Sequence, residues 1–497
     1  MVRPVRTSLI AVSVMIVLFV LPVGISAKKK SSKRKSRVVR NVPVVLMAPV
    51  ERSVPVIVTP PVLSSANTGA GTNFIRSEAP VQALQQAPAA SAASTSANGS
   101  GIGDSEGVSK KPAWARFPSA PTAGSLIISE FRVRGPNGAN DEFIEIYNDS
   151  GADHTVAGGG TGYAVAASNG VARCVIPNGT VIPNRGHYLC VNSVGYSLAS
   201  YPAGNGTTAT GDATYTTDIP DNAGIAIFNT SVAANFVLAN RWDAVGSTSE
   251  ANTLYKEGTG YPALVPFSID YSFYRDTCGK GGSITTFGQC MISTPKDTNN
   301  NAADFIFVDT NGTSAGAGQR LGAPGPENLS SPIQRNDSFP VTLLDPCVGT
   351  ASPPNRVRDF TSSPANNSTF GTLDIRRTVT NNTGGNVTRI RWRVIDLTTF
   401  PAPSGIADLR PRTSTAVVVT VDRAPCGSGT SNVTVQGTTL EQPPSQPNGG
   451  GFNSSMSSGT VTLATPIANG GTLDLRFLLG IQQTGSFKFF VNVEALP

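Results

Sequence analysis

Histidine, charge and long apolar runs are scarce in this sequence. Among 497 residues there are two histidines, His154 and His187, and 14% of the residues are charged. Because histidine is the usual general base near neutral pH, its scarcity removes many hydrolytic mechanisms. The sequence also lacks a G-x-S-x-G elbow, a phosphate-binding G-x-x-x-x-G-K-[ST] loop and a two-histidine zinc motif. We therefore predict structural roles for both histidines and no catalytic, cofactor or metal site.

Glycine and proline are abundant, with 51 and 37 residues, and Thr, Asn and Ser are plentiful. Glu and Lys, which favour helices, are few. This mixture is typical of many short strands joined by turns. Asn-Gly dipeptides, which form tight turns, separate apolar stretches at 137–138, 169–170, 178–179 and 311–312. The composition predicts an all-β protein, and its length gives room for two or three domains.

The net charge of +6 comes from one end of the chain. The first forty residues contain ten Lys and Arg and no acid, whereas residues 41–497 contain 28 basic and 32 acidic residues, a net of −4. The part that we expect to fold is slightly acidic and has no zinc finger, RNA-binding aromatic strand or basic recognition helix. We do not expect the folded domains to bind nucleic acid. Any polyanion contact is assigned to the basic N-terminal tail.

One pair of predicted strands, within residues 374–396, is locally basic. An exposed row of arginines on a sheet is able to bind a polyanion, but a solvated row also discourages edge-to-edge pairing of sheets. We favour the solvated sheet face. The arginines concerned are Arg376, Arg377, Arg389, Arg391 and Arg393.

Residues 1–27 have the layout of a secretory signal peptide. Two arginines precede an apolar run at residues 9–23, and the small-residue segment PVGISA ends at Ala27. The run is shorter than the ~20 residues that a spanning helix needs, so we expect cleavage and no remaining transmembrane helix. The alternative is an uncleaved anchor, because eight basic residues follow directly and disfavour translocation.

The six cysteines fit an exported protein. None lies in a C-x-x-C motif, so we predict disulfides rather than zinc or redox sites. Six cysteines allow fifteen connectivities, and the sequence does not choose among them. Pairing of sequence neighbours would close two short loops and one long loop, and the alternative is six buried thiols. The cysteines are Cys174, Cys190, Cys278, Cys290, Cys347 and Cys426.

Changes of composition divide the chain. Residues 28–120 combine the basic run with Pro, Ala, Ser and Gly and lack amphipathic periodicity, which predicts a disordered tether. Short apolar segments between turns fill residues 121–326 and predict a β-sandwich domain. A linker follows at 327–355. Residues 356–497 are predicted to form a second β-sandwich, because segments such as RIRWRVIDL alternate apolar and charged residues with the period of a strand.

Several segments together resemble the bacterial form of the lamin tail domain, over about residues 124–326: SLIISEFRVRGPNGANDEFIEIYN, NGTVIPNRGHYLCVN, PDNAGIAIFN, RWDAVG and RLGAPGPEN. The most specific part is I-S-E-x-x-x-x-G followed by D-E-F-I-E-I-x-N. The resemblance implies an immunoglobulin-like β-sandwich that acts as a non-catalytic adhesive or targeting module in exported proteins. It implies no catalytic residue. The signature residues in this chain are Glu130, Gly135, Asp141, Glu142, Phe143, Glu145 and Asn148.

The acidic signature residues are also the best candidates for chemistry. Strand alternation sends Glu142 and Glu145 to opposite faces, so they cannot form one pair within a regular strand, whereas Glu130 is able to pair with either. We expect each Glu to bind a nearby arginine or backbone N–H groups. The alternative is a secreted hydrolase that uses Glu130 with Glu142 or Glu145, since glycosidases need two carboxyl groups. The nearby arginines are Arg132, Arg134, Arg173, Arg185 and Arg241.

The segment KDTNNNAADF has oxygen-bearing side chains at the spacing of the first half of an EF-hand loop. It lacks the glycine and the final glutamate of that loop, and Asn- and Asp-rich turns often satisfy their own backbone instead. We do not predict a calcium site here. The residues are Asp297, Asn299, Asn301 and Asp304.

These observations predict an exported, non-enzymatic protein with two β-sandwiches, secreted or associated with the cell envelope. Its expected function is adhesive or structural binding to a protein or an envelope polymer. The alternatives are the carboxylate hydrolase and polyanion binding through the basic tail.

Overall fold

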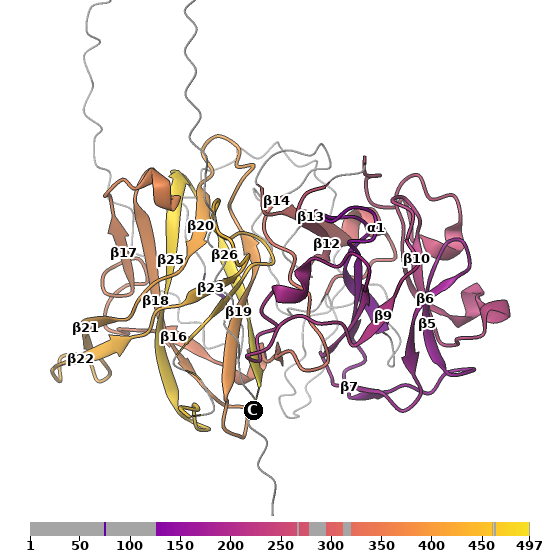
Figure 1. Cartoon of the computed structure of the whole chain (residues 1–497). Coiled ribbons are helices and arrows are strands. Elements are labelled where there is room, and N and C mark those ends of the chain that lie inside the picture. Colours follow the sequence, from indigo (N-terminus) through magenta and orange to yellow (C-terminus); the bar gives the residue numbers. More distant parts are fainter. Residues whose placement is uncertain are drawn as a thin grey trace, which may run out of the picture. The chain divides into compact units, whose positions relative to one another are not determined.

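The computed structural model describes residues 74–75, 126–265, 268–277, 295–311, 320–459, 461 and 464–496 (Figure 1). The described residues consist mostly of β-strands in several sheets, which confirms the all-β prediction. The predicted signal peptide, most of the predicted tether, and Cys278 and Cys290 lie outside the described residues. Among the described residues, no helix has the length and apolar character to cross a membrane.

The strands up to residue 321 are β1 (Phe74–Ile75), β2 (Leu126–Arg132), β3 (Phe143–Asn148), β4 (His154–Thr155), β5 (Gly162–Ala167), β6 (Ala172–Pro177), β7 (Val181–Ile182), β8 (His187–Asn192), β9 (Ala213–Tyr215), β10 (Ile225–Phe228), β11 (Arg241–Val245), β12 (Tyr271–Arg275), β13 (Phe305–Asp309) and β14 (Arg320–Leu321). The later strands are β15 (Ile333–Gln334), β16 (Val341–Leu343), β17 (Arg356–Asp359), β18 (Thr372–Thr380), β19 (Arg389–Leu397), β20 (Asp408–Arg412), β21 (Val417–Asp422), β22 (Thr430–Val435), β23 (Thr439–Gln442), β24 (Ser455–Ser457), β25 (Thr472–Gln483) and β26 (Phe489–Leu496).

Helical structure among the described residues is limited to single turns. They are α1 (Asn301–Asp304) and the 3-10 turns η1 (Leu198–Ser200), η2 (Ala233–Asn235), η3 (Leu238–Asn240), η4 (Thr253–Tyr255), η5 (Asn336–Ser338) and η6 (Pro364–Asn366).

Two sheets enclose the core of the N-terminal sandwich. Sheet 1 has the order β14-β13-β12-β2-β3-β8-β9, and sheet 2 has the order β11-β10-β5-β6. Alternation along β3 explains how sheet 1 forms, because Ile144 and Ile146 point into the core while Phe143 and Glu145 point to the other face. The core between the sheets also receives aromatic residues of β2, β12 and β13, with Phe131 stacked on Phe273 at 5.1 Å.

Two further sheets enclose the core of the C-terminal sandwich. Sheet 3 has the order β1-β26-β19-β24-β23, with β15 also paired to β26, and sheet 4 has the order β16-β18-β25-β20, with β17 paired to β18. Ile390, Trp392 and Val394 of β19 face this core and meet Phe477 of β25. The outer face of sheet 3 lies against the outer face of sheet 1, as contacts described below show, within the compact unit Thr68–Pro497.

The segment predicted to be a linker at 327–355 takes part in the C-terminal sheets. Ile333 and Gln334 pair with β26, and β16 pairs with β18 over residues 341–343. Within the predicted tether, β1 also pairs with β26. Both additions are short edge strands, whose two or three residues give too little periodicity to be predicted from sequence.

Two disulfides are present among the described cysteines. Cys174 on β6 is bonded to Cys190 on β8, and the bond therefore joins sheets 2 and 1 across the core. Cys347 is bonded to Cys426, which lies in the connection between β21 and β22. These are the pairs of sequence neighbours that the spacing allowed, and they fit an oxidising compartment.

We expect each disulfide to stabilise the fold by restricting the unfolded chain. With sequence separations of 16 and 79 residues, loop-closure entropy gives about 3 kcal/mol for the first bond and about 4.5 kcal/mol for the second. The double variants C174A/C190A and C347A/C426A should lose these amounts in the free energy of unfolding, measured with urea. A smaller loss for the 79-residue loop than for the 16-residue loop would contradict the entropic account.

Candidate functional site

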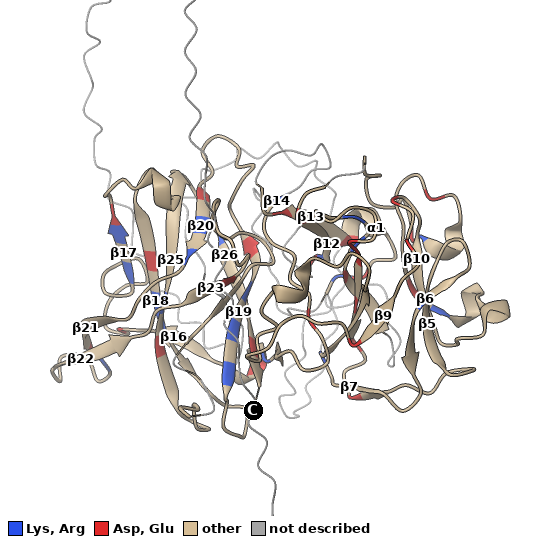
Figure 2. Ribbon diagram, viewed as in Figure 1, with Lys and Arg blue, Asp and Glu red and all other residues tan. Residues whose placement is uncertain are grey.

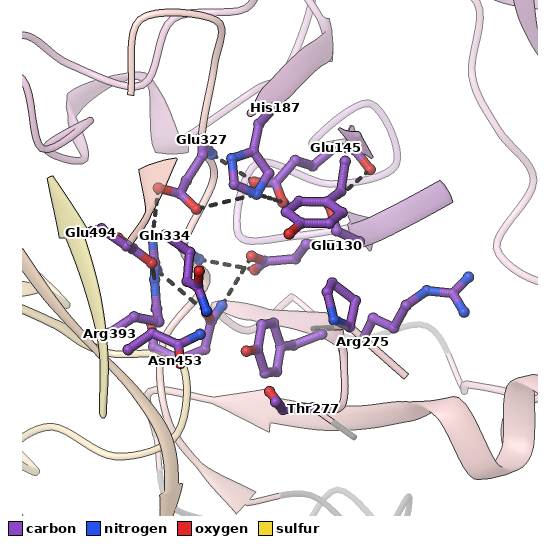
Figure 3. Close-up of a pocket in the computed structure, with 16 residues that line it drawn as sticks. Glu130, Glu145, His187, Arg275, Thr277, Glu327, Gln334, Arg393, Asn453 and Glu494 are labelled. Carbon is purple, nitrogen blue, oxygen red and sulfur yellow. Dashed lines mark hydrogen bonds and ion pairs between the residues drawn. The ribbon is translucent and has the colours of Figure 1, made fainter. Parts of the chain in front are cut away.

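Charged side chains meet where the outer face of sheet 1 lies against the outer face of sheet 3 (Figure 3). Glu130 and Glu145 are directly opposite each other on β2 and β3, and a bulge at Ser129 places both on this face. Sheet 3 contributes arginines from β19 and a glutamate from β26, and Glu327 comes from the chain between the sandwiches. We call these residues the junction cluster: Glu130, Glu145, His187, Glu327, Arg391, Arg393 and Glu494.

Arginine–carboxylate pairs connect the two sandwiches. Arg391 bonds Glu327 through a terminal nitrogen and Glu494 through Nε at 2.7 Å. Arg393 lies 3.3 Å from Glu327 and 3.1 Å from Glu494. The arginine side chains are 0% and 3% exposed, so the pairs exclude water. Glu327 and Glu494 thus each bind both Arg391 and Arg393, and we call this arrangement the fork. Charge-assisted hydrogen bonds between guanidinium and carboxylate groups are strong and directional.

Glu130 and Glu145 hold the backbone of a segment that we call the strap, residues 322–331. Glu130 accepts hydrogen bonds from the N–H of Gly325 at 2.9 Å and from Asn453 at 2.9 Å. Glu145 accepts from the N–H of Glu327 at 2.7 Å and from the Ser129 hydroxyl at 2.5 Å. The expectation that these acids satisfy arginines or backbone N–H groups is therefore met by backbone N–H groups.

Burial and neighbouring charges shift the pKa values of the cluster in different directions. Burial raises the pKa of Glu130, and burial together with repulsion from Glu130 and Glu327 raises the pKa of Glu145 well above its ordinary value. Burial also lowers the pKa of His187. Burial alone would raise the pKa of Glu327, but His187, Arg393 and Arg391 lower it. The guanidinium groups therefore favour the charged form of Glu327, whereas burial disfavours the charged forms of Glu130, Glu145 and His187.

A small cavity of about 50 Å³ adjoins the cluster, lined by Glu130, Glu145, His187, Glu327 and Arg393 among others (Figure 3). Ligand pockets usually measure about 300–1,000 Å³, so this cavity has room for an ion or a few water molecules. Glu130 and Glu145 are 2% and 3% exposed. The solvent-reachable pair of carboxyl groups that the hydrolase alternative requires is not formed by these two residues.

A wider surface pocket of about 320 Å³ lies between the two sandwiches. Its one acidic group already has partners, because Asp270 bonds both Arg132 and the hydroxyl of Tyr201. Its lining is Ser200, Tyr201, Asp270, Thr310, Pro443, Pro444, Ser445 and Pro447.

The remaining signature acids hold loops to sheet 1. Asp141 binds the buried guanidinium of Arg132 and accepts the N–H groups of Asn137 and Ser197. Gly135 is required here, because an added Cβ would lie 2.6 Å from the Asp141 carboxylate and 2.7 Å from the Arg132 guanidinium. The first half of the signature therefore encodes one buried ion pair and the turn around it.

Glu142, Phe143 and Asn148 complete the signature. Glu142 faces the core side of β3 and accepts the N–H of Ile219 at 2.6 Å and the side-chain amide of Asn192 at 2.8 Å. Phe143 packs in an apolar cluster on the outer face of sheet 1. The Asn148 side-chain amide bonds three carbonyl groups at the end of β3. Glu142 and Glu145 do lie on opposite faces, as alternation predicts.

The KDTNNNAADF side chains are not gathered around one point. Asn301 bonds the backbone of Gly246, Glu257 and Ala244, and Asp304 accepts the N–H of Thr298. Asp304 therefore satisfies the backbone of its own turn, whereas Asn301 fixes the segment to residues 244–257.

Asp297 instead joins a second acidic cluster, with Asp243 and Glu257. Arg275 contacts this cluster, at 2.6 Å from Asp243 and 3.5 Å from Asp297. A guanidinium thus already supplies a cation among these carboxylates.

The prediction that Arg391 and Arg393 lie on a solvated face of β19 is wrong. Ile390, Trp392 and Val394 face the core as expected, but Arg391 and Arg393 are buried because sheet 1 and the strap cover the other face of sheet 3. Figure 2 shows the basic segments of β19 in blue. Arg377 is buried as well. Of the five arginines, three are therefore inaccessible to a polyanion.

Sequence reasoning missed Glu327, Glu494 and the role of the segment at residues 192–217. This segment contacts the C-terminal sandwich, because the carbonyl of Pro202 accepts a hydrogen bond from Gln442 at 2.7 Å. Asn205 likewise accepts from Arg389 at 3.3 Å. The sequence feature that could have identified Glu494 is a single acidic residue within the otherwise mostly apolar strand β26.

His154 lies apart from the cluster. Its Nε2 is 3.1 Å from the Tyr163 hydroxyl, and its ring meets Trp242 edge-on at 5.1 Å. This packing agrees with the structural role predicted for it. Comparison with known protein families, curated proteins and solved structures gives no match to this chain.

The buried fork predicts a large loss of stability when one member is removed. R391A leaves Glu327 and Glu494 buried with fewer donors, so we expect the free energy of unfolding to fall by about 3–5 kcal/mol. R185A, which breaks the exposed pair with Asp337, should cost less than about 1 kcal/mol. Chemical denaturation measures both, and equal losses would contradict the assignment of the fork.

Glu142 predicts a pH dependence. Burial raises its pKa to about 8, whereas the unfolded chain ionises near the ordinary value of 4.5. Between these values the folded state binds the extra proton, so this contribution to stability is lost as pH rises from about 5 to above 8. E142Q cannot titrate, and we expect its unfolding free energy to decline less than that of the wild type over this range.

Glu250 provides the control for that measurement. Burial acts to raise the pKa of Glu250, but hydrogen bonds from the N–H groups of Gly224 and Asn252 outweigh this effect and lower the pKa. Glu250 is therefore ionised in both states across the same range, and E250Q should keep the wild-type pH slope. Parallel profiles for wild type and E142Q would contradict the Glu142 assignment.

Proposed function

We propose that the protein is an exported, non-catalytic binding protein whose N-terminal sandwich is of the lamin-tail type. The observation that carries the binding role is an apolar surface loop between β10 and β11, residues 229–240. Val232, Val237 and Leu238 are 41%, 46% and 66% exposed, and the alanines between and beside them are exposed too. No residue of the loop is charged. Exposed apolar clusters of this kind mark sites of protein–protein contact.

The loop is held in a defined conformation. Phe236 turns inward and stacks on Phe228 with ring centroids 4.6 Å apart, and Tyr255 packs against the same ring. The N–H of Asn235 bonds the carbonyl of Val232, and the Asn240 side chain bonds the carbonyl of Asn235. A loop that is ordered before binding loses little conformational entropy when it docks, which favours affinity.

The chemistry of the loop favours a protein partner over an envelope polymer. A hydrated, charged polymer is bound through hydrogen bonds and ion pairs, and this loop presents aliphatic side chains. The non-catalytic part of the proposal is supported by the use of Glu130, Glu142 and Glu145, each of which bonds the backbone of a loop or strap.

The binding role is tested with the full mature chain and cell-envelope extract. Photo-cross-linking followed by mass spectrometry should capture a discrete partner with the wild type. The variant V237S/L238S should lose it, because polar side chains remove the apolar contact. V418S alters a 70% exposed valine on β21 and should leave capture unchanged. Equal capture by V237S/L238S and wild type would contradict the assignment of this loop.

The non-catalytic role is tested on the same protein. We expect no release of soluble sugars or peptides from envelope polymer. Turnover that E130Q or E145Q abolishes while the fold is retained would establish the hydrolase alternative instead.

A further inference from the structure

One part of the junction cluster has the donor atoms of a metal site. Nε2 of His187 lies 3.4 Å from Oε2 of Glu327 and 3.6 Å from Oε1 of Glu145 (Figure 3). One ligand atom from each residue lies within 4.8 Å of the others. A tetrahedral zinc site with bonds of about 2.0–2.1 Å has ligand–ligand edges of about 3.3–3.4 Å. The two spacings to His187 are close to that edge length, and the carboxylate oxygens of Glu145 and Glu327 lie within 4.8 Å of each other.

The far sides of the same groups are fixed by other residues. Oε1 of Glu327 faces Arg391 and Arg393, which leaves Oε2 directed at His187. Oε2 of Glu145 accepts the N–H of Glu327, which leaves Oε1 on the side of His187 and Ser129. Outer hydrogen bonds that orient ligands in this way are the usual support of metal sites.

The cavity beside these atoms points to an additional occupant. Several charged side chains line it, and its volume of about 50 Å³ leaves room for an ion and water. One buried nitrogen atom of its lining residues, Nδ1 of His187, has no hydrogen-bond partner within the described part of the chain. Buried polar atoms are rarely left so, which indicates that something polar occupies the cavity.

Charge supports a cation rather than an anion. The cluster contains four glutamates and two arginines, an excess of two carboxyl groups that a divalent ion would balance. The second acidic cluster, around Asp243, differs because Arg275 contacts its carboxylates directly. Within the described ranges, the guanidinium groups that contact Glu327 pair with its Oε1 and not with Oε2, the atom that faces His187.

We propose that Glu145, His187 and Glu327 form a binding site for one divalent transition-metal ion, with Zn²⁺ as the best match to an N,O,O donor set. The ion would link β3 and β8 of sheet 1 to the strap, and water from the cavity supplies the remaining ligand position. Its role is structural: it fixes the strap, and through Glu327 and the arginines it fixes the contact between the sandwiches.

The test uses the tag-free mature chain, stripped of metal by a chelator and kept oxidised so that no thiol competes. Isothermal titration with Zn²⁺ should give one ion per chain, and elemental analysis after dialysis should agree. Zn²⁺ should also raise the melting temperature, because it binds the folded state. Co²⁺ in its place should give the intense visible absorption of a four-coordinate ion.

Variants separate this site from other binding. H187N, E145Q and E327Q should each weaken Zn²⁺ binding by more than about 100-fold, beyond the 10–100-fold loss typical of outer-shell partners. H154N alters the other histidine of the chain and should bind as the wild type does. E494Q removes a glutamate that binds the same two arginines as Glu327 but does not face His187, and its loss should stay below 10-fold.

Three outcomes would overturn the proposal. They are no Zn²⁺ uptake by the wild-type chain, loss of binding in H154N but not in H187N, and several weak equivalents that the three ligand variants leave unchanged. The first outcome does not depend on the folding of any variant. Circular dichroism of each variant shows whether lost binding comes from a lost ligand or from a lost fold.

Discussion

The contact between the two sandwiches depends on the complete pairing of buried charges. Arginines on β19 would be costly to bury without partners, and Glu327 and Glu494 each contact both of them. Because the fork is formed by side chains from sheet 3 and from the strap, neither part satisfies its charges alone. The position of the strap is in turn fixed by Glu130 and Glu145 of sheet 1. One network therefore sets the relation of sheet 1, strap and sheet 3.

This dependence explains the unusual use of carboxylates in the N-terminal sandwich. Signature acids occupy buried positions where an apolar side chain would pack more cheaply, and each accepts backbone N–H groups of a neighbouring loop. Glu142 holds residue 219, Asp141 holds residues 137 and 197, and Glu145 holds residue 327. A carboxylate that accepts two or more N–H groups fixes a loop in one place, since the buried group cannot find other partners.

The sequence predicted the direction of side chains better than it predicted the residues that surround them. Period-two alternation correctly placed Trp392 in the core and Arg391 on the opposite face. It could not show that the opposite face was covered, because the cover comes from residues more than sixty positions away. The same limit applies to the candidate site, where Glu145 was found but its neighbours His187 and Glu327 were not. The local sequence pattern determines the direction in which a side chain points, whereas packing between distant segments determines which residues surround it.

The order of the junction-cluster residues along the chain has a consequence for how the protein folds. Glu130, Glu145 and His187 precede the strap, whereas Arg391, Arg393 and Glu494 lie in strands formed from residues 389–496. During synthesis or export the N-terminal strands emerge first, as domains generally do. Until the later strands are available, Glu130 and Glu145 have only their partners within sheet 1, the hydroxyl groups of Ser272 and Ser129. The residues at the C-terminal end of the chain therefore complete the cover over acids that were made first.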